Sequence, residues 1–125
     1  MEINKKVLVI DDELHIRRVI EIKLKNRGYQ VITATNGLEG LEIIKTQKPD
    51  AVITDINMPG MDGEALCRLT DVLKIERPFL TIVMTARISP EERNWISELT
   101  ETQFMEKPFS PSKLLDAVNK YFGVD

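Results

Sequence analysis

The sequence predicts an α/β fold in which a central parallel sheet is covered by helices on both faces. Short apolar runs alternate regularly with helical patterns, the runs lack the apolar–polar alternation of a half-exposed sheet, and helix-start and helix-stop residues lie between them. Strict alternation of strand and helix requires crossover connections, which are almost always right-handed. We therefore expect a flavodoxin-like three-layer sandwich, a (βα)5 chain with a five-stranded parallel sheet in the order 2-1-3-4-5.

The strand segments are short, apolar and followed by polar or turn-forming residues. They are expected at 5–10, 30–34, 51–54, 79–84 and 103–106. The third is central to the chain, because it has no polar residue except Thr54 and ends at Asp55, before the helix-breaking pair Pro59 and Gly60. Such a run is typical of a strand that is buried on both faces.

The helices are predicted by their boundary residues. Gly28 ends the first, Asn36 with Glu39 begins the second, Asp62 begins the third, and Ser89 with Pro90 begins the fourth. The predicted helices cover residues 13–27, 37–47, 63–74, 90–100 and 111–122.

Length and composition describe one ordinary globular domain over residues 1–125. The net charge of −3 does not favour nucleic acid or an anionic membrane, and no apolar stretch approaches the roughly 20 residues of a membrane span. Cys67 is the single cysteine, which excludes an internal disulfide and a thiolate metal cluster. The first residues lack the form of a signal peptide, so a cytoplasmic location is expected.

Reactive polar residues follow four of the five expected strands. In a parallel sheet the carboxyl ends of the strands meet at one edge, which would gather Asp11, Asp12, Asp55, Thr85 and Lys107. Carboxylate pairs at about 4 Å repel by about 4 kcal/mol at an effective dielectric constant of about 20, so cations must offset them. Lys107 supplies one charge, and oxygen ligands without His or Cys favour Mg²⁺ or Mn²⁺. A carboxylate beside such a cation, a hydroxyl and an ammonium group is suited to phosphoryl transfer.

Four motifs resemble the receiver domain of two-component response regulators, and the resemblance extends over the whole chain. The motifs are Val7-Leu-Val-Ile-Asp-Asp-Glu13, Asp55-Ile-Asn-Met-Pro-Gly-Met-Asp-Gly63, Ile82-Val-Met-Thr-Ala86 and Lys107-Pro-Phe109. The resemblance implies that Asp55 is the phosphoacceptor and that Thr85 and Lys107 contact the phosphoryl group. It also implies a cis peptide bond between Lys107 and Pro108.

The same resemblance implies a magnesium site and a partner. Asp12 would bind Mg²⁺ directly, Asp11 through water, and the backbone carbonyl of Asn57 would complete the protein ligands with Asp55. A sensor histidine kinase, a phosphotransfer protein or a small acyl phosphate would donate the phosphoryl group. The domain would catalyse its own phosphorylation and slow hydrolysis, without turning over a free metabolite. The resemblance also allows a phosphorylation-dependent homodimer.

Two further residues are assigned by hypothesis. Phe104, three residues before Lys107, matches the switch aromatic of the family, although a Phe on a short strand is also a common core residue. With Thr85 it would remodel the surface of the fourth helix, fifth strand and fifth helix, and so control an output partner. Leu14 lies well off the face of the first helix that carries Ile16 and Ile20, so we expect it to help dock the phosphodonor protein.

Three other functions are compatible with an α/β fold of this size. A phosphohydrolase of the haloacid dehalogenase type needs Asp-x-Asp after its first strand, which Asp11-Asp12-Glu13 does not provide. An FMN-binding protein needs a phosphate loop where this chain has acids. A pseudo-receiver that acts only as an interaction module is the remaining alternative, and the full set of acids with Thr85 and Lys107 argues against it.

Overall fold

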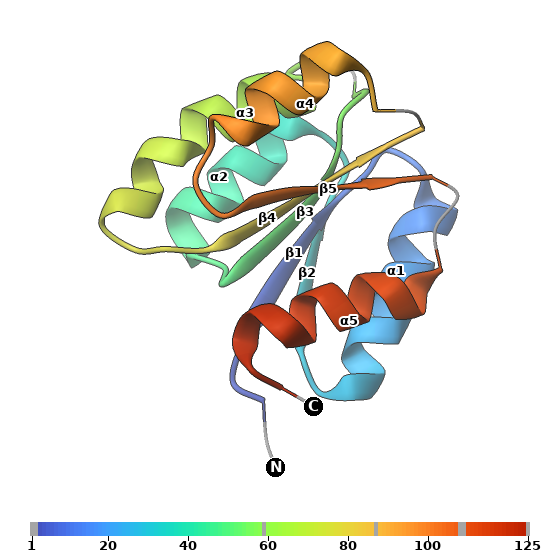
Figure 1. Ribbon diagram of the computed structural model, residues 1–125. Helices are drawn as coiled ribbons and strands as arrows, with labels where there is room; N and C mark the ends of the chain where they lie inside the picture. Colours follow the sequence, from blue (N-terminus) through green and yellow to red (C-terminus); the bar gives the residue numbers. More distant parts are fainter. Residues whose placement is uncertain (1–2, 59, 87, 108–109, 125) are drawn as a thin grey trace.

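A single five-stranded parallel sheet forms the centre of the molecule in the computed structural model (Figure 1). The structure describes residues 3–58, 60–86, 88–107 and 110–124. Strand order is β2-β1-β3-β4-β5, as predicted. The strands are β1 (Lys6–Ile10), β2 (Gln30–Ala34), β3 (Ala51–Asp55), β4 (Leu80–Thr85) and β5 (Thr102–Glu106).

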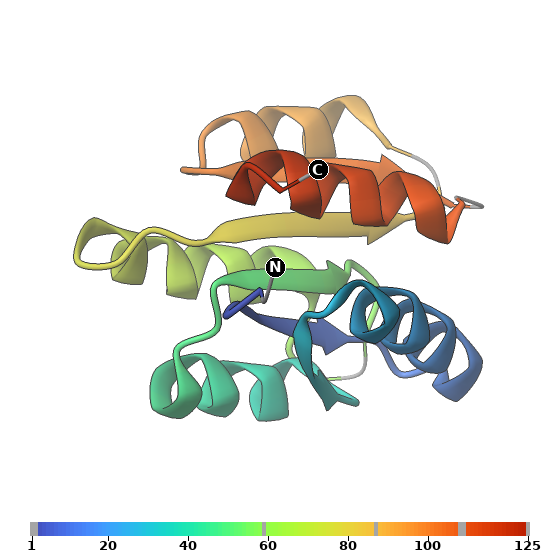
Figure 2. The same cartoon turned by 90° about the horizontal axis from the view of Figure 1, so that it is seen from below.

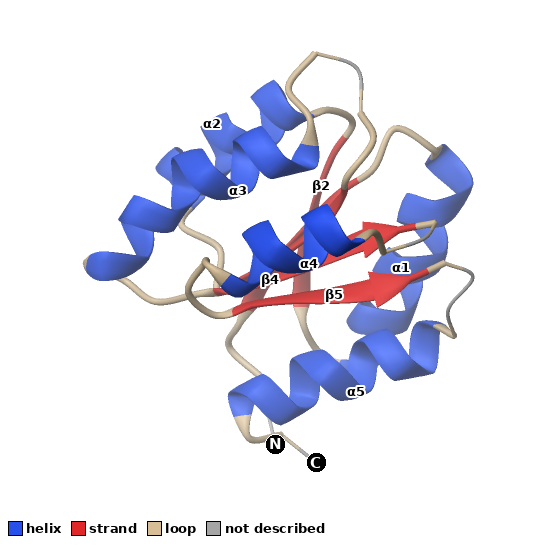
Figure 3. Cartoon of the chain, turned by 45° about the horizontal axis from the view of Figure 1, so that its top comes forward, coloured by secondary structure: helices blue, strands red, loops and turns tan. Residues whose placement is uncertain are grey.

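Helices cover both faces of the sheet. Figures 1 and 3 show α1 and α5 on one face and α2, α3 and α4 on the other. The helices are α1 (Leu14–Arg27), α2 (Gly37–Gln47), α3 (Gly63–Asp71) with the 3-10 turn η1 (Val72–Ile75), α4 (Pro90–Ser97) and α5 (Pro111–Phe122). The fold class is therefore the predicted flavodoxin-like sandwich.

Side-chain alternation along the strands divides the core between the two faces. In β1, Val7 and Val9 pack with α1 and α5, whereas Leu8 and Ile10 pack with α2 and α3. A third cluster, around Val83 and Trp95, lies beneath α4. Every position of the central strands faces a helix layer, which explains why their sequences are apolar without alternation.

The predicted helix-start residues cap their helices. The Asn36 side chain accepts a hydrogen bond from the Glu39 amide, and the Asp62 side chain accepts one from the Ala65 amide. Ser89 and Glu92 form a reciprocal capping box. Gly28 adopts φ 113°, the left-handed conformation expected at the end of α1.

Two predicted helix ends are wrong, and tertiary contacts explain both. The third helix changes to a 3-10 turn at Val72, and within that turn the ammonium group of Lys74 donates to the Thr100 carbonyl at 2.5 Å. The fourth helix ends at Ser97, short of residue 100, and the Thr100 amide donates instead to Asp71 Oδ1 at 3.0 Å. Val19 shares the face of α1 that carries Ile16 and Ile20, yet its side chain is 36% exposed.

All strands point in one direction, which sets the position of the site. The strand arrowheads in Figure 2 lie toward the same side of the sheet. The loops after β1, β3, β4 and β5 therefore meet at one edge, where ligands bind in open α/β sheets.

Candidate phosphoacceptor and metal site

Asp11 is held in place by contacts with β2, with α1 and with the residue before α1. It follows β1 directly and is fully buried, with 0% of its surface exposed. Its amide donates to the Ala34 carbonyl at the end of β2 at 3.2 Å, and its Oδ1 accepts from the Glu13 amide at 2.9 Å. The Arg17 guanidinium donates to its main-chain carbonyl at 2.7 Å. These contacts leave the Asp11 carboxylate little freedom to turn.

Asp55 ends β3 and is 7% exposed. The following turn is anchored on both sides, because the Ile56 amide donates to the Met84 carbonyl at 3.0 Å and the Gly63 amide donates to the Ile56 carbonyl at 2.8 Å. A Cβ atom at Gly63 would lie 2.7 Å from the Asp55 carbonyl oxygen. Glycine is therefore required where α3 begins, since the helix packs directly on the backbone of the acid.

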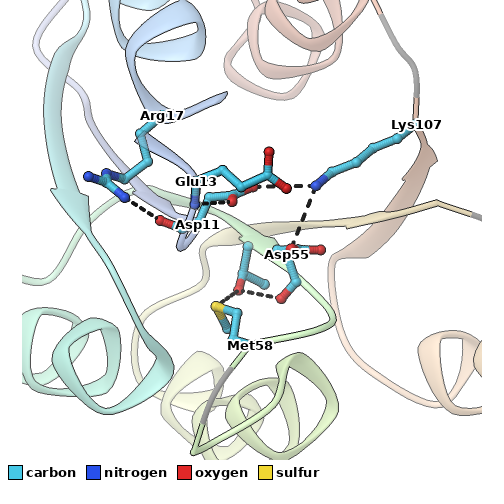
Figure 4. A network of polar contacts seen from close by, with 7 residues as sticks. Asp11, Glu13, Arg17, Asp55, Met58 and Lys107 are labelled. Atoms are coloured by element: carbon cyan, nitrogen blue, oxygen red, sulfur yellow. Dashed lines mark hydrogen bonds and ion pairs between the residues drawn. The ribbon is translucent and has the colours of Figure 1, made fainter. Parts of the chain in front are cut away.

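Lys107 connects the two acids from the other side of the crevice. Its amide donates to the Thr85 carbonyl at 2.6 Å, which continues the pairing of β5 with β4. Figure 4 shows its side chain extending between the two carboxylates. The Nζ atom lies 3.5 Å from Asp11 Oδ2 and 3.6 Å from Asp55 Oδ2. Residues as far as 96 positions apart in the sequence thus form one ionic cluster.

Three carboxylates converge at this edge. Ligand oxygens of Asp11, Asp12 and Asp55 all lie within 4.8 Å of one another, and Asp12 is exposed whereas the other two are buried. Burial raises the pKa of the Asp55 carboxyl above its ordinary value; nearby Lys107 lowers this pKa, Asp11 raises it, and the amides of Asn57 and Ile56 lower it. The net direction indicates that burial disfavours the ionised carboxylate more than Lys107 and the two amides favour it.

The donor set fits a hard divalent cation. It consists of carboxylate oxygens, one side of it is open to solvent at Asp12, and no His or Cys belongs to the cluster found among the described residues. Mg²⁺ prefers one or two carboxylates and retains several waters, which suits a half-open site. The structure brings these three acids together from the ends of two strands, β1 and β3.

The other predicted residues lie at or near the same edge. Thr85 is buried at the end of β4, and Asn57 is exposed two residues after Asp55. Phe104 lies on β5, is 36% exposed, and has the Arg93 guanidinium 5.0 Å from its ring centroid. Leu14 begins α1 and is 54% exposed. The predicted cis bond between Lys107 and Pro108 lies outside the described residues.

Sequence reasoning overlooked Arg17, which contacts the site, and Glu106, which links β5 to the segment before α4. The Arg17 side chain donates to the Asp11 carbonyl. Arg17 lies four residues after Glu13, and this spacing, which places both residues on one side of the helix, could have indicated that Arg17 faces the end of β1. Glu106 Oε1 accepts from the Ile88 amide at 3.2 Å, which ties β5 to the segment before α4. No local pattern indicates the second contact, because it joins residues brought together only by the sheet.

Comparison with known proteins identifies related sequences and structures. The family model described as the response regulator receiver domain matches residues 7–119. The alkaline phosphatase synthesis transcriptional regulatory protein PhoP of Bacillus subtilis (strain 168) is 37% identical over 111 residues, which cover 89% of this chain and 45% of that protein. Sporulation initiation phosphotransferase F of the same organism is 35% identical over 118 residues, 94% of each chain.

A solved structure gives the same relationship. Chemotaxis protein CheY4 of Vibrio cholerae superposes with a TM-score of 0.85 at 30% identity, over 94% of this chain and 98% of that one. The chain spans about half the length of PhoP and of the transcriptional regulator ycf27 from Cyanophora paradoxa, of which it covers 47%. Among the described residues, no helix is both long and apolar enough to cross a membrane.

Proposed function

This chain belongs to the family of response regulator receiver domains, and we propose that its Asp55 accepts a phosphoryl group from a histidine kinase, a phosphotransfer protein or a small acyl phosphate. Receiver domains are signalling domains and not metabolic enzymes. The observation that carries the proposal is the cluster of three carboxylates bridged by Lys107, in which Asp55 alone ends a central strand. Asp11 also contacts Lys107, but it is fully buried and both of its carboxylate oxygens already accept hydrogen bonds, so Asp55 is the acid that a phosphoryl donor would meet beside the cation site and the ammonium group.

The proposed cation is Mg²⁺, held by Asp11, Asp12, Asp55 and the Asn57 backbone carbonyl. Support comes from the oxygen-only donor set and from the pKa of Asp55, which burial and Asp11 raise. When bound, the cation supplies positive charge that neutralises the acids and the phosphoryl oxygens. Mn²⁺ would serve by the same chemistry.

Asp55, Lys107 and Thr85 have distinct roles in the proposed phosphoryl transfer. An oxygen of the Asp55 carboxylate attacks phosphorus, a P–O bond forms as the P–N bond of a protonated phosphohistidine breaks, and neutral imidazole leaves with the bonding electrons. The Lys107 ammonium and the Thr85 hydroxyl bind the phosphoryl oxygens. Attack by water on the same phosphorus later releases phosphate and restores the carboxylate, which is the slow self-dephosphorylation we propose.

The proposed readout is a change in the surface formed by α4, β5 and α5. The added group carries about −1.5 to −2 charges, and Thr85 moves toward it. Phe104 then leaves the Arg93 guanidinium and turns inward. The support is that Phe104 is exposed and contacts α4 through Arg93. Amide exchange with and without beryllofluoride tests this readout, and equal exchange over α4 and β5 in both states would contradict it.

The proposed docking site for the phosphodonor protein includes Leu14. This side chain is apolar and 54% exposed at the crevice end of α1. Leu14→Ala should slow transfer from the donor protein and leave transfer from acetyl phosphate unchanged. Ile22→Ala is the matched control, because Ile22 is 59% exposed on the same helix but two turns away. Equal slowing by both donors, or by both variants, would count against docking at Leu14.

Labelling with acetyl phosphate tests the central proposal. We expect the wild-type protein to acquire an acid-stable, hydroxylamine-labile phosphoryl group in Mg²⁺, and to acquire none when Mg²⁺ is chelated. Asp55→Asn should abolish labelling, whereas Asp50→Asn should retain it, since the Asp50 carboxylate is paired with Arg77 outside the cluster. Persistent labelling of the Asp55 variant would overturn the assignment of the phosphoacceptor.

The output of this signal is proposed by likeness to the relatives. Some matched relatives are twice as long and are described as transcriptional regulators, whereas sporulation initiation phosphotransferase F is matched over nearly its whole length. We propose that phosphorylation controls a downstream protein or an attached output domain. Sedimentation of the beryllofluoride form would show whether a phosphorylation-dependent homodimer accompanies this control.

A further inference from the structure

Arg17 satisfies a main-chain carbonyl that neither the sheet nor the helix can satisfy. Asp11 lies after the last residue of β1 and before the first residue of α1, so its carbonyl belongs to neither regular element. A carbonyl in such a turn is costly to leave without a partner when it is taken from water. The Arg17 Nη1 atom donates to this oxygen at 2.7 Å, from a side chain that is itself partly buried (Figure 4).

With this contact, each polar atom of Asp11 has a partner from a different part of the fold. The amide donates to β2, the carbonyl accepts from α1, and the two carboxylate oxygens accept from the Glu13 amide and the Lys107 ammonium. Asp12 is the next residue and is exposed. Its position therefore depends on how firmly the backbone on its N-terminal side is held.

We propose that Arg17 is a positioning residue for the cation site, which fixes the turn between β1 and α1 so that Asp11 and Asp12 face the same ion. This inference rests on the proposed function in one respect, namely that the ion is Mg²⁺. Arg17 acts through the Asp11 backbone and does not contact substrate or metal. Groups that orient metal ligands in this way commonly change metal affinity by about 10–100-fold when they are removed.

A charge effect of Arg17 and a positioning effect of Arg17 predict opposite changes in Mg²⁺ affinity. The Arg17 guanidinium points at a carbonyl and not at a carboxylate, so its charge only repels an incoming cation. If charge were its main effect, Arg17→Ala would bind Mg²⁺ more tightly. If positioning dominates, the same variant binds Mg²⁺ more weakly although a positive charge has been removed.

The experiment is a calorimetric titration of Mg²⁺ into the unphosphorylated protein and its variants. We expect about tenfold weaker binding for Arg17→Ala, and an intermediate affinity for Arg17→Lys, which retains a charge and a donor of similar reach. Arg18→Ala is the matched control, because it removes the same charge from an exposed neighbour and should change the affinity by less than about twofold. In labelling with acetyl phosphate, Arg17→Ala should need more Mg²⁺ for half-maximal rate and reach the wild-type rate at saturation.

The possible results separate this inference from the proposed function. Unchanged or tighter binding by Arg17→Ala overturns the positioning role, as does equal weakening by Arg18→Ala. If Arg17→Ala does not fold, Arg17→Lys decides the matter: weaker binding than wild type in a fully folded protein supports the role, and wild-type binding overturns it. A wild-type protein that binds no Mg²⁺ overturns this inference and the proposed cation site together.

Discussion

Asp55→Asn should stabilise the metal-free protein while it abolishes phosphorylation. Asp55 faces Asp11 and Asp12 with oxygens within 4.8 Å, so each repulsion amounts to at least about 3.5 kcal/mol at an effective dielectric constant of about 20. Attraction to Lys107 at 3.6 Å contributes about 4.6 kcal/mol on the same scale. Two repulsions against one attraction leave about 2 kcal/mol, and solvent around the exposed Asp12 reduces this figure. Burial of the Asp55 carboxylate, the largest cause of its raised pKa, acts in the same direction, so we expect a net gain of about 1 kcal/mol.

The assay is urea denaturation at neutral pH, in EDTA and in excess Mg²⁺. In EDTA the Asp55→Asn variant should exceed the wild type by about 1 kcal/mol in free energy of unfolding. Mg²⁺ at about 100 times its dissociation constant should add about 2.7 kcal/mol to the wild type and much less to the variant. Asp50→Asn is the matched control with the opposite sign, because Asp50 accepts from Arg77 at 2.6 Å and from the Lys6 amide at 2.9 Å.

The pH dependence of stability tests the effect of the Asp55 charge independently. The folded-state pKa of Asp55 is raised, so the folded protein binds its proton more readily than the unfolded chain does. The contribution of Asp55 to stability therefore increases as pH falls from neutrality through that pKa. In EDTA the stability gap between Asp55→Asn and wild type should narrow on acidification. A variant less stable than wild type, or a gap that widens at lower pH, would refute the reasoning.

Two further predictions concern residues around the site and the core. Gly63→Ala should lower the free energy of unfolding by about 1–3 kcal/mol and slow labelling of Asp55, because the added Cβ atom meets backbone. Gly40→Ala should lower it less, because its Cβ atom meets the movable end of the Ile10 side chain. Equal losses for the two variants in urea denaturation would contradict this. Burial lowers the pKa of Lys74 to about 8, so the free energy of unfolding should rise above that pH by at most about 1.4 kcal/mol per pH unit. Lys74→Met should lack this rise, and an identical rise in both proteins would show that Lys74 is not its source.

Local sequence predicted the elements because local interactions define them. The bounds of β2 coincide with the prediction, and the caps at Asn36, Asp62 and Ser89 each depend on a hydrogen bond spanning three residues. The alternation of strand and helix predicted a parallel sheet, and its strand order is the one expected for a flavodoxin-like fold. The predicted length of α4 was wrong because the Thr100 amide donates its hydrogen bond to Asp71, which is distant in sequence, and not to a carbonyl of the helix.

By itself, the sequence determined the fold class, the strand ends and the chemical kinds of group gathered at one edge. Only the tertiary structure decided that Asp11 is buried and Asp12 exposed, that Lys107 reaches two acids at once, and that Arg17 turns back to hold the Asp11 carbonyl. The physical reason is that periodicity and capping act over a few residues, whereas charge separation and burial depend on atoms that lie tens of residues apart along the chain. The positions of such groups after the strands place them at the same edge of the sheet, but only packing sets the distances between them.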